Sequence, residues 1–237
     1  MSEISTHPAF NQEPLPTTPQ DGLVRGGSES IARADTRAVF GQVMGLVALT
    51  VGCAALGAYV GRNLAGGTGI IFFIAAFACI FALNIASSRG HEQLAVGLLF
   101  GLGLLLGLAV APVLEAYARA EPSALWQAAG ATAAFVGALG SYGYATRRDL
   151  SSWARGLFWA LLGLIVFGIV LIFVSIPHSH IIYAVAGLAI FGAFTIFDFN
   201  RLRRTNAAGA VPIAASIFLD IFNVFLLLLQ LFGGGRD

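Results

Sequence analysis

Seven long apolar runs constrain this chain more than any other feature of its sequence. Each run is close to the length of about 20 apolar residues with which an α-helix crosses the hydrocarbon core of a bilayer. The predicted runs are 38–61, 68–87, 94–116, 124–145, 156–176, 181–200 and 212–232. A helix satisfies its own backbone hydrogen bonds in lipid. The sequence therefore predicts an all-α polytopic integral membrane protein, a bundle of seven transmembrane helices.

The composition points to the same class. Hydrophobic residues make up 57% of the chain and charged residues 11%, with a mean hydropathy of +0.83, whereas soluble proteins average about 25% charged residues. Residues 1–35 differ from the rest because they are polar and hold half of the eight prolines. We predict a disordered cytoplasmic tail over 1–35, with no cleavable signal peptide, and a membrane domain over 36–237.

The basic residues predict an orientation. The sequence has no lysine, and ten of its thirteen arginines fall on one side when the seven runs are threaded through a membrane; only Arg62, Arg119 and Arg236 fall on the other. Basic residues collect in cytoplasmic loops. We therefore expect a cytoplasmic N-terminus and a C-terminus on the far side. A bacterial inner membrane is the expected location.

Pairs of glycines at four-residue spacing recur along the apolar runs. Such spacing lets two helix backbones approach closely in lipid, so it predicts a compact bundle. The pairs are Gly41 with Gly45, Gly57 with Gly61, Gly97 with Gly101, and Gly103 with Gly107.

Two aspartates stand inside apolar runs, Asp198 in the sixth and Asp220 in the seventh. A carboxylate in hydrocarbon is costly, so it faces the bundle interior or a wet cavity and marks a functional site. At a rise of 1.5 Å per residue, Asp198 lies about 8 Å and Asp220 about 14 Å from the same membrane face. The short link between the runs makes them antiparallel neighbours. We expect the two aspartates, hereafter the aspartate pair, to lie side by side.

Two carboxyl groups in one poorly solvated site cannot both ionise cheaply. They share a proton and titrate as one coupled unit, which makes a proton sensor. When ionised, the same oxygens could transiently hold a hard cation such as Ca²⁺, which prefers six to eight oxygen ligands. Two carboxylates are too few for a tight metal site and suit a permeating ion better. No cofactor is expected.

Arginines offer a structural explanation for the first aspartate. Asp198 could be neutralised by Arg201 one turn later, or by Arg89 from a neighbouring cytoplasmic helix end. Asp220 has no basic residue in its own run. A third acid, Glu115, ends the third run; its i+4 neighbour, an arginine, can pair with it, and it could otherwise attract cations at an outer mouth.

Four segments, in this order, resemble the transmembrane Bax-inhibitor motif family. They are the loop TRRDLS at 146–151, the run GLFWALLGLIVFGIVLIFVSI at 156–176, IFDFNRLRR at 196–204, and FLDIFNVFLLLLQLF at 218–232. The resemblance covers about residues 37–232. It implies a seven-helix bundle with the last helix central, and a pH-sensitive calcium leak governed by an aspartate pair that matches Asp198 and Asp220. The family usually shows Tyr-Asp-Thr where this chain has Phe197, Asp198 and Phe199.

Other functional classes fit less well. An intramembrane serine protease could use Ser141, but all four histidines lie outside the predicted runs, so a base is missing. A retinal protein needs a lysine. No enzyme activity is expected. A regulatory membrane protein that binds a partner, such as a membrane protease or a cell-death factor, stays open, and the proline-containing tail favours it.

Overall fold

The computed structural model describes residues 19–64, 67–174 and 177–234, and their side chains from Thr36 onward. The chain divides into two units, residues 1–35 and 36–237. The second unit carries the bundle described below. Residues 1–18 of the predicted tail lie outside the described residues.

All regular structure in the described ranges is helical. Seven α-helices follow one another, with short 3₁₀ turns at Gly61–Asn63 and Ala207–Gly209. The α-helices are α1 (Pro19–Val60), α2 (Gly69–Ser88), α3 (Glu92–Ala120), α4 (Pro122–Ala145), α5 (Trp153–Phe173), α6 (Ser179–Leu202) and α7 (Ala210–Gly233). Each predicted run corresponds to one of these helices, so the all-α prediction is confirmed.

Helix α1 extends further than its predicted run. It begins at Pro19 rather than at residue 38, so the backbone over 19–35 is helical where disorder was predicted. Proline suits the first turn of a helix, where its missing N–H has no intrahelical partner. Three of the four tail prolines precede this position, and none follows before the bundle.

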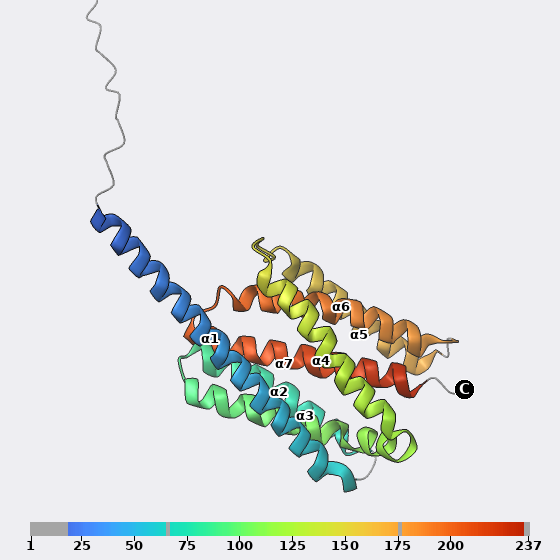
Figure 1. Ribbon diagram of the computed structural model, residues 1–237. Coiled ribbons are helices and arrows are strands. Elements are labelled where there is room, and N and C mark those ends of the chain that lie inside the picture. Colours follow the sequence, from blue (N-terminus) through green and yellow to red (C-terminus); the bar gives the residue numbers. More distant parts are fainter. Residues whose placement is uncertain (1–18, 65–66, 175–176, 235–237) are drawn as a thin grey trace, which may run out of the picture. The chain divides into compact units, whose positions relative to one another are not determined.

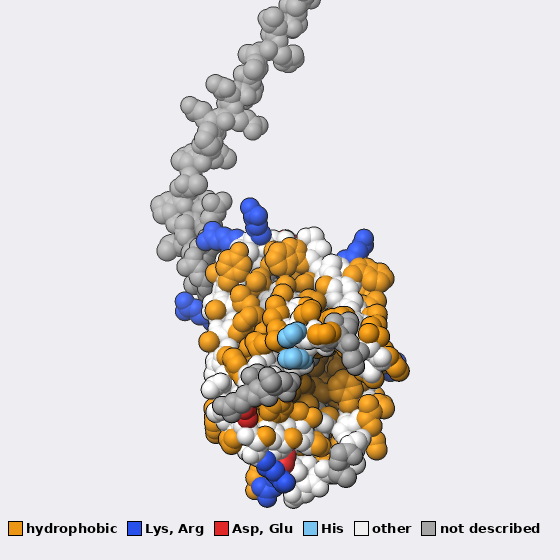
Figure 2. Space-filling view, turned by 90° about the vertical axis from the view of Figure 1, so that its right-hand side faces the viewer, with side chains coloured by type: hydrophobic (Ala, Val, Ile, Leu, Met, Phe, Trp, Pro, Cys, Tyr) orange, Lys and Arg blue, Asp and Glu red, His pale blue; other side chains and the backbone are white. Residues whose placement is uncertain are grey.

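Six of the described helices are long and apolar enough to cross a membrane by length and composition: the part of α1 from Thr36, and α2, α3, α5, α6 and α7. Helix α4 has 24 residues but is rich in small and polar side chains and falls short. Large hydrophobic side chains also cover the outside, with Ile71 66% and Trp159 62% exposed. Figure 2 shows hydrophobic side chains over most of one face and basic ones at its margin. Such a surface belongs in lipid.

Glycines bring α1 and α3 into close contact. A Cβ at Gly107 would collide with the Ala54 carbonyl oxygen, and one at Gly57 would collide with the Leu104 carbonyl oxygen. A Cβ at Gly103 would lie 2.5 Å from the Thr50 carbonyl oxygen. In contrast, Gly97 meets nothing within 4 Å. The predicted glycine spacing therefore marks a helix interface at some positions and open surface at others.

Helices α4 and α6 are joined in the same manner. A Cβ at Gly143 of α4 would collide with the Ile196 carbonyl oxygen of α6. Helix α5 packs beside α6, and α2 packs along α3. The short turn between α2 and α3 needs Gly90, whose φ of 75° is in the left-handed region.

Helix α7 runs between these two groups of helices (Figure 1) and contacts α2, α3, α4 and α6. It is the most enclosed of the six membrane-length helices: 56% of its most apolar 18 residues are buried, against at most 39% in the others. Its buried face includes Ile213, Ile217, Val224 and Leu228, which belong to the main hydrophobic core. The buried face of α7 is thus part of the core that the surrounding helices share.

Candidate functional site

The two predicted aspartates both lie in the bundle interior. Asp198 is near the end of α6 and is 4% exposed; Asp220 is near the middle of α7 and is 5% exposed. Helices α6 and α7 pack against each other, and the carboxyl groups of the two residues are hydrogen-bonded. The structure therefore brings the predicted pair together.

A hydrogen bond between two carboxyl groups forms only when one of them is protonated. A carboxylate only accepts, so one member of the aspartate pair must carry a proton to donate. Ser216, one turn before Asp220 on α7, supplies a further hydrogen bond to Asp198. Sequence reasoning missed Ser216, although its i−4 spacing from Asp220 places both on one face of α7. The aspartate pair and the Ser216 hydroxyl thus form one polar cluster between α6 and α7.

One oxygen of Asp220 is distinctive. Asp220 Oδ2 is the one buried side-chain polar atom in the described residues without a hydrogen-bond partner. A buried oxygen left without a partner costs about 1–3 kcal/mol. Together, the described side chains offer no cluster of three or more His, Cys, Asp or Glu residues that could hold a metal ion. Within the described residues, the aspartate pair thus has too few neighbouring donors for a resident metal.

The two candidate arginine partners differ. Arg201 is close enough to Asp198 to act on it electrostatically, although no ion pair within 4.0 Å joins them among the described residues. Its side chain is exposed, one helical turn beyond the aspartate. Arg89 follows α2 and is also exposed. Within the described ranges, no hydrogen bond or ion pair joins Arg89 to either aspartate.

Donors in the last turn of α6 and just after it bind the end of α4 and the loop that follows. Asn200 is 3% exposed, and its side-chain amide donates to the carbonyl oxygens of Thr146 at 2.8 Å and Arg148 at 3.2 Å. Arg203 donates to the Thr146 carbonyl oxygen at 3.1 Å. Asn200 also donates to the Gly143 carbonyl oxygen at 3.3 Å, and Arg203 to that of Tyr144 at 3.4 Å. These two carbonyls lie in the last turn of α4, where a helix leaves them without intrahelical partners. Asn200 was not predicted as a site residue. The sequence feature that could have indicated it is a polar amide side chain two residues after Asp198, near the end of an apolar run.

The loop after α4 is held by charge as well. Arg204 Nη1 lies 2.8 Å from Asp149 Oδ1. The same Asp149 oxygen accepts hydrogen bonds from the Ser151 hydroxyl at 2.5 Å and the Ser151 backbone N–H at 2.9 Å. These two hydrogen bonds, and then the Arg204 guanidinium, hold the pKa of Asp149 below its ordinary value of 3.8. The contacts of the folded loop therefore stabilise the carboxylate form of Asp149.

This shift gives a prediction about acid stability. A carboxyl group whose pKa is depressed by folding stabilises the fold above its unfolded pKa, and this contribution is lost as the pH falls through the folded pKa. We expect Asp149→Asn to lower the melting temperature in detergent only slightly at pH 7, because the group is exposed and water screens its contacts. The difference should shrink below about pH 4. A difference that stays constant down to about pH 2.5 would contradict this assignment.

Glu115 is placed away from the aspartate pair. It lies near the end of α3 and accepts a hydrogen bond from Arg119 Nε at 2.8 Å, as the i, i+4 spacing predicts. The end of α3 adjoins the start of α4, whereas Asn200 binds the carbonyls at the other end of α4. Glu115 and the aspartate pair thus lie toward opposite ends of the bundle.

Comparisons with known proteins identify a family for the membrane unit. The family model described as Inhibitor of apoptosis-promoting Bax1 matches residues 36–237. The inner membrane protein YbhL of Escherichia coli is 29% identical over 238 residues, which cover 91% of this chain and all of that protein. A protein of Helicobacter pylori is 30% identical, with 69% of this chain and 70% of that protein covered.

The family match covers the whole membrane domain, including both aspartates and the donors that clamp α4. It confirms the resemblance predicted from the sequence, and its similarity to an inner membrane protein agrees with the apolar outer surface. The chain is an integral, multi-pass membrane protein that belongs to the Bax inhibitor family.

Proposed function

We propose that the protein is a pH-sensitive leak for calcium or a similar cation, with Asp198 and Asp220 as its proton sensor and gate. The observation that supports this proposal is the hydrogen-bonded, buried aspartate pair inside a membrane bundle. Intramembrane acids commonly line ion pathways and proton relays. Protonation neutralises the pair and favours the closed contact, whereas ionisation makes the two carboxylates repel and frees oxygens for a cation.

The direct test is ion flux across a pH series. Purified protein in liposomes that enclose a calcium indicator should admit Ca²⁺ at a rate that changes with external pH, compared with empty liposomes. Replacement of Ca²⁺ by K⁺ or Mg²⁺ in the same assay measures selectivity. Flux equal to that of empty liposomes at every pH from 5 to 8 would rule out the leak.

The proposed path requires all seven helices to span, with a cytoplasmic N-terminus and α7 as the central helix. The contacts of α7 with four other helices support its central position. Helix α4 spans in this proposal although its composition is less apolar, because its contacts with α6 and α7 enclose part of its surface. Small residues and glycine are tolerated in helices that pack closely in lipid.

Reporter fusions test this topology. A reporter after Asp237 should be non-cytoplasmic, and one inserted between Arg204 and Ala207 should be cytoplasmic, because basic residues stay inside. A cytoplasmic result at Asp237 would mean that one helix does not cross, and α4 would then be the helix to examine, since it alone falls short in composition among the described helices.

The alternative is a regulatory protein that binds a partner through residues 1–35 and conducts no ions. The proline-containing sequence of this segment supports the alternative. Deletion of residues 1–35 separates the two functions. The leak should survive the deletion, because every proposed site residue lies in 36–237, whereas a tail-mediated role should be lost.

A further inference from the structure

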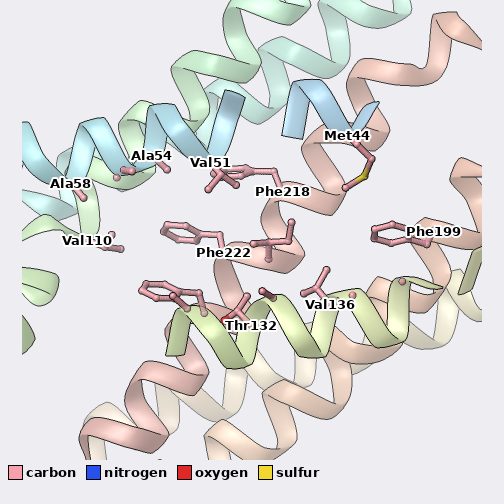
Figure 3. A pocket seen from close by; sticks show the side chains of 18 of the residues that line it. Met44, Val51, Ala54, Ala58, Val110, Thr132, Val136, Phe199, Phe218 and Phe222 are labelled. Atoms are coloured by element: carbon pink, nitrogen blue, oxygen red, sulfur yellow. The ribbon is translucent and has the colours of Figure 1, made fainter. Parts of the chain in front are cut away.

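The membrane unit contains a second feature, an apolar cavity that the aspartate pair does not line. It has a volume of about 740 Å³ and is walled by α1, α3, α4 and α7, with Phe199 of α6. Figure 3 shows Val51 and Ala54 of α1 facing Val136 and Thr132 of α4, with Phe218 and Phe222 of α7 between them. The volume is within the range of about 300–1,000 Å³ that is typical of small-molecule sites.

The chemistry of the walls selects an apolar occupant. No charged residue of the described chain lines the cavity, and its side-chain hydroxyl groups come from Thr132, Ser141 and Tyr144. The Thr132 hydroxyl already donates to the Ala128 carbonyl oxygen at 2.6 Å. A buried water needs two to four polar partners, so these walls hold water poorly. If the cavity were empty, the atoms that line it would lose dispersion contacts on that side.

The cavity opens sideways between α1 and α4. Six of its lining residues are also exposed, two from α1 and four from α4: Val51, Ala55, Ala129, Ala133, Gly137 and Ser141. The outside of the unit is covered by exposed apolar side chains and so faces lipid. Acyl chains of the bilayer are therefore the molecules that meet this opening.

Positive charge marks one end of the cavity. The rings of Phe40 in α1 and Tyr144 in α4 both line it and meet with centroids 5.0 Å apart. Arg37 lies one turn before Phe40, and Arg147 lies three residues after Tyr144. Because α1 and α4 run in opposite directions along the cavity, both exposed arginines lie beyond the same ring pair. The nearby acid Asp149 is already held by Arg204.

We propose that this cavity binds a membrane phospholipid with an anionic headgroup. One acyl chain enters between α1 and α4 and lies against Val136, Phe218 and Phe222, and the phosphate-bearing headgroup is held by Arg37 and Arg147. The acyl chain makes apolar contacts with the cavity walls, and the two arginines give the site a preference for a negatively charged headgroup. A second copy of this chain or the polar residues 1–18 would fit less well, since neither source offers a slender apolar chain next to an anion.

Photolabelling tests the location. The full chain is placed in phosphatidylcholine vesicles with a small share of phosphatidylglycerol that carries a diazirine in its acyl chain. After illumination, labelled peptides should include α4 around Val136 and α7 around Phe222. Labels confined to outward residues of α2 and α5 would overturn the proposal. So would a cavity shielded from label by residues 1–18 or by a second copy, which cross-linking would identify.

A cavity-filling variant with a matched control tests the site itself. A Cβ at Gly137, which lines the cavity, meets nothing within 4 Å, and the same holds for Gly130, which lies two turns earlier on α4 outside the cavity lining. Gly137→Phe should remove the labels at Phe222, whereas Gly130→Phe should leave them unchanged. Equal labelling of the two variants would overturn the proposal.

The headgroup preference is tested independently by competition. Unlabelled phosphatidylglycerol should displace the probe better than phosphatidylcholine with the same chains. Near a membrane surface each arginine contributes about a fivefold preference for anionic lipid, so Arg37→Gln with Arg147→Gln should remove most of this difference. Arg155→Gln, which also changes an exposed arginine, should retain it. Equal displacement by the two lipids from the unmodified chain would overturn the anionic preference.

Discussion

Asp198→Asn and Asp220→Asn, each made alone, are expected to abolish the pH dependence of cation flux through the reconstituted protein. Asparagine keeps the size and one oxygen of the side chain but cannot ionise. The remaining carboxyl group then has no acidic neighbour, so the coupled titration of the aspartate pair disappears. Flux measured from pH 5 to pH 8 should become nearly constant in both variants, at a rate set by the state that each amide imitates.

The double variant and a control make this result specific. Residues that act as one unit are strongly non-additive, so Asp198→Asn with Asp220→Asn should differ little from either single variant. Glu115→Gln removes an acid that lies toward the other end of the bundle and pairs with Arg119, and it should keep the full pH response. A pH response retained in both single variants would refute a shared proton.

A purely structural role for Asp198 gives a different outcome. If Asp198 serves only to neutralise Arg201, then Asp198→Asn should lower the melting temperature in detergent while flux keeps its dependence on pH. Melting temperature and flux, measured on the same preparation, distinguish these roles. The exposed position of Arg201 favours the shared proton, because an exposed guanidinium is already solvated.

The second large effect is expected at the contact between α1 and α3. Gly107→Leu places a side chain where even a Cβ would collide with the Ala54 carbonyl oxygen. Backbone cannot yield as a flexible side chain can, so the two helices must separate. Overpacking of this kind costs about 1–3 kcal/mol, and occasionally more. The free energy of unfolding should fall by at least this amount in a denaturant titration in detergent.

Gly97→Leu is the matched control on the same helix. A Cβ at Gly97 meets nothing within 4 Å, and the residue is exposed. Leucine also has a better helix propensity than glycine by about 1 kcal/mol. Gly97→Leu should therefore leave the stability unchanged or raise it. Equal losses in the two variants would show that glycine is needed for the conformation of α3 rather than for its contact with α1.

The aspartate pair could be located from sequence because few physical arrangements were open to it. An acid in an apolar run must turn inward, and a short link makes consecutive helices antiparallel. Those two constraints are enough to place Asp198 and Asp220 near one another. To predict that Ser216 also reaches the pair, one must know how α7 is rotated about its axis. The hydrophobic pattern does not give this rotation when all sides of a helix are apolar.

The glycine contacts show where such reasoning ends. Gly97 and Gly107 both belong to pairs with the same four-residue spacing, yet only Gly107 meets the backbone of α1. The difference depends on which face of α3 turns toward α1, and that is decided by the packing of the whole bundle. The apolar cavity is likewise invisible in the sequence, because it depends on how far α1 and α4 stand apart above α7.

The position of α7 between the two groups of helices has a consequence for how the chain is made. Helix α7 follows α1 to α6 in synthesis, so the faces of α2, α3, α4 and α6 that it covers have no partner until it arrives. Lipid must occupy those faces in the meantime, and Asp198 has no second carboxyl group beside it. The late helix must then displace that lipid as it enters. Ribosome-bound chains that stop before residue 210 should consequently be cleaved by membrane proteases far faster than finished chains.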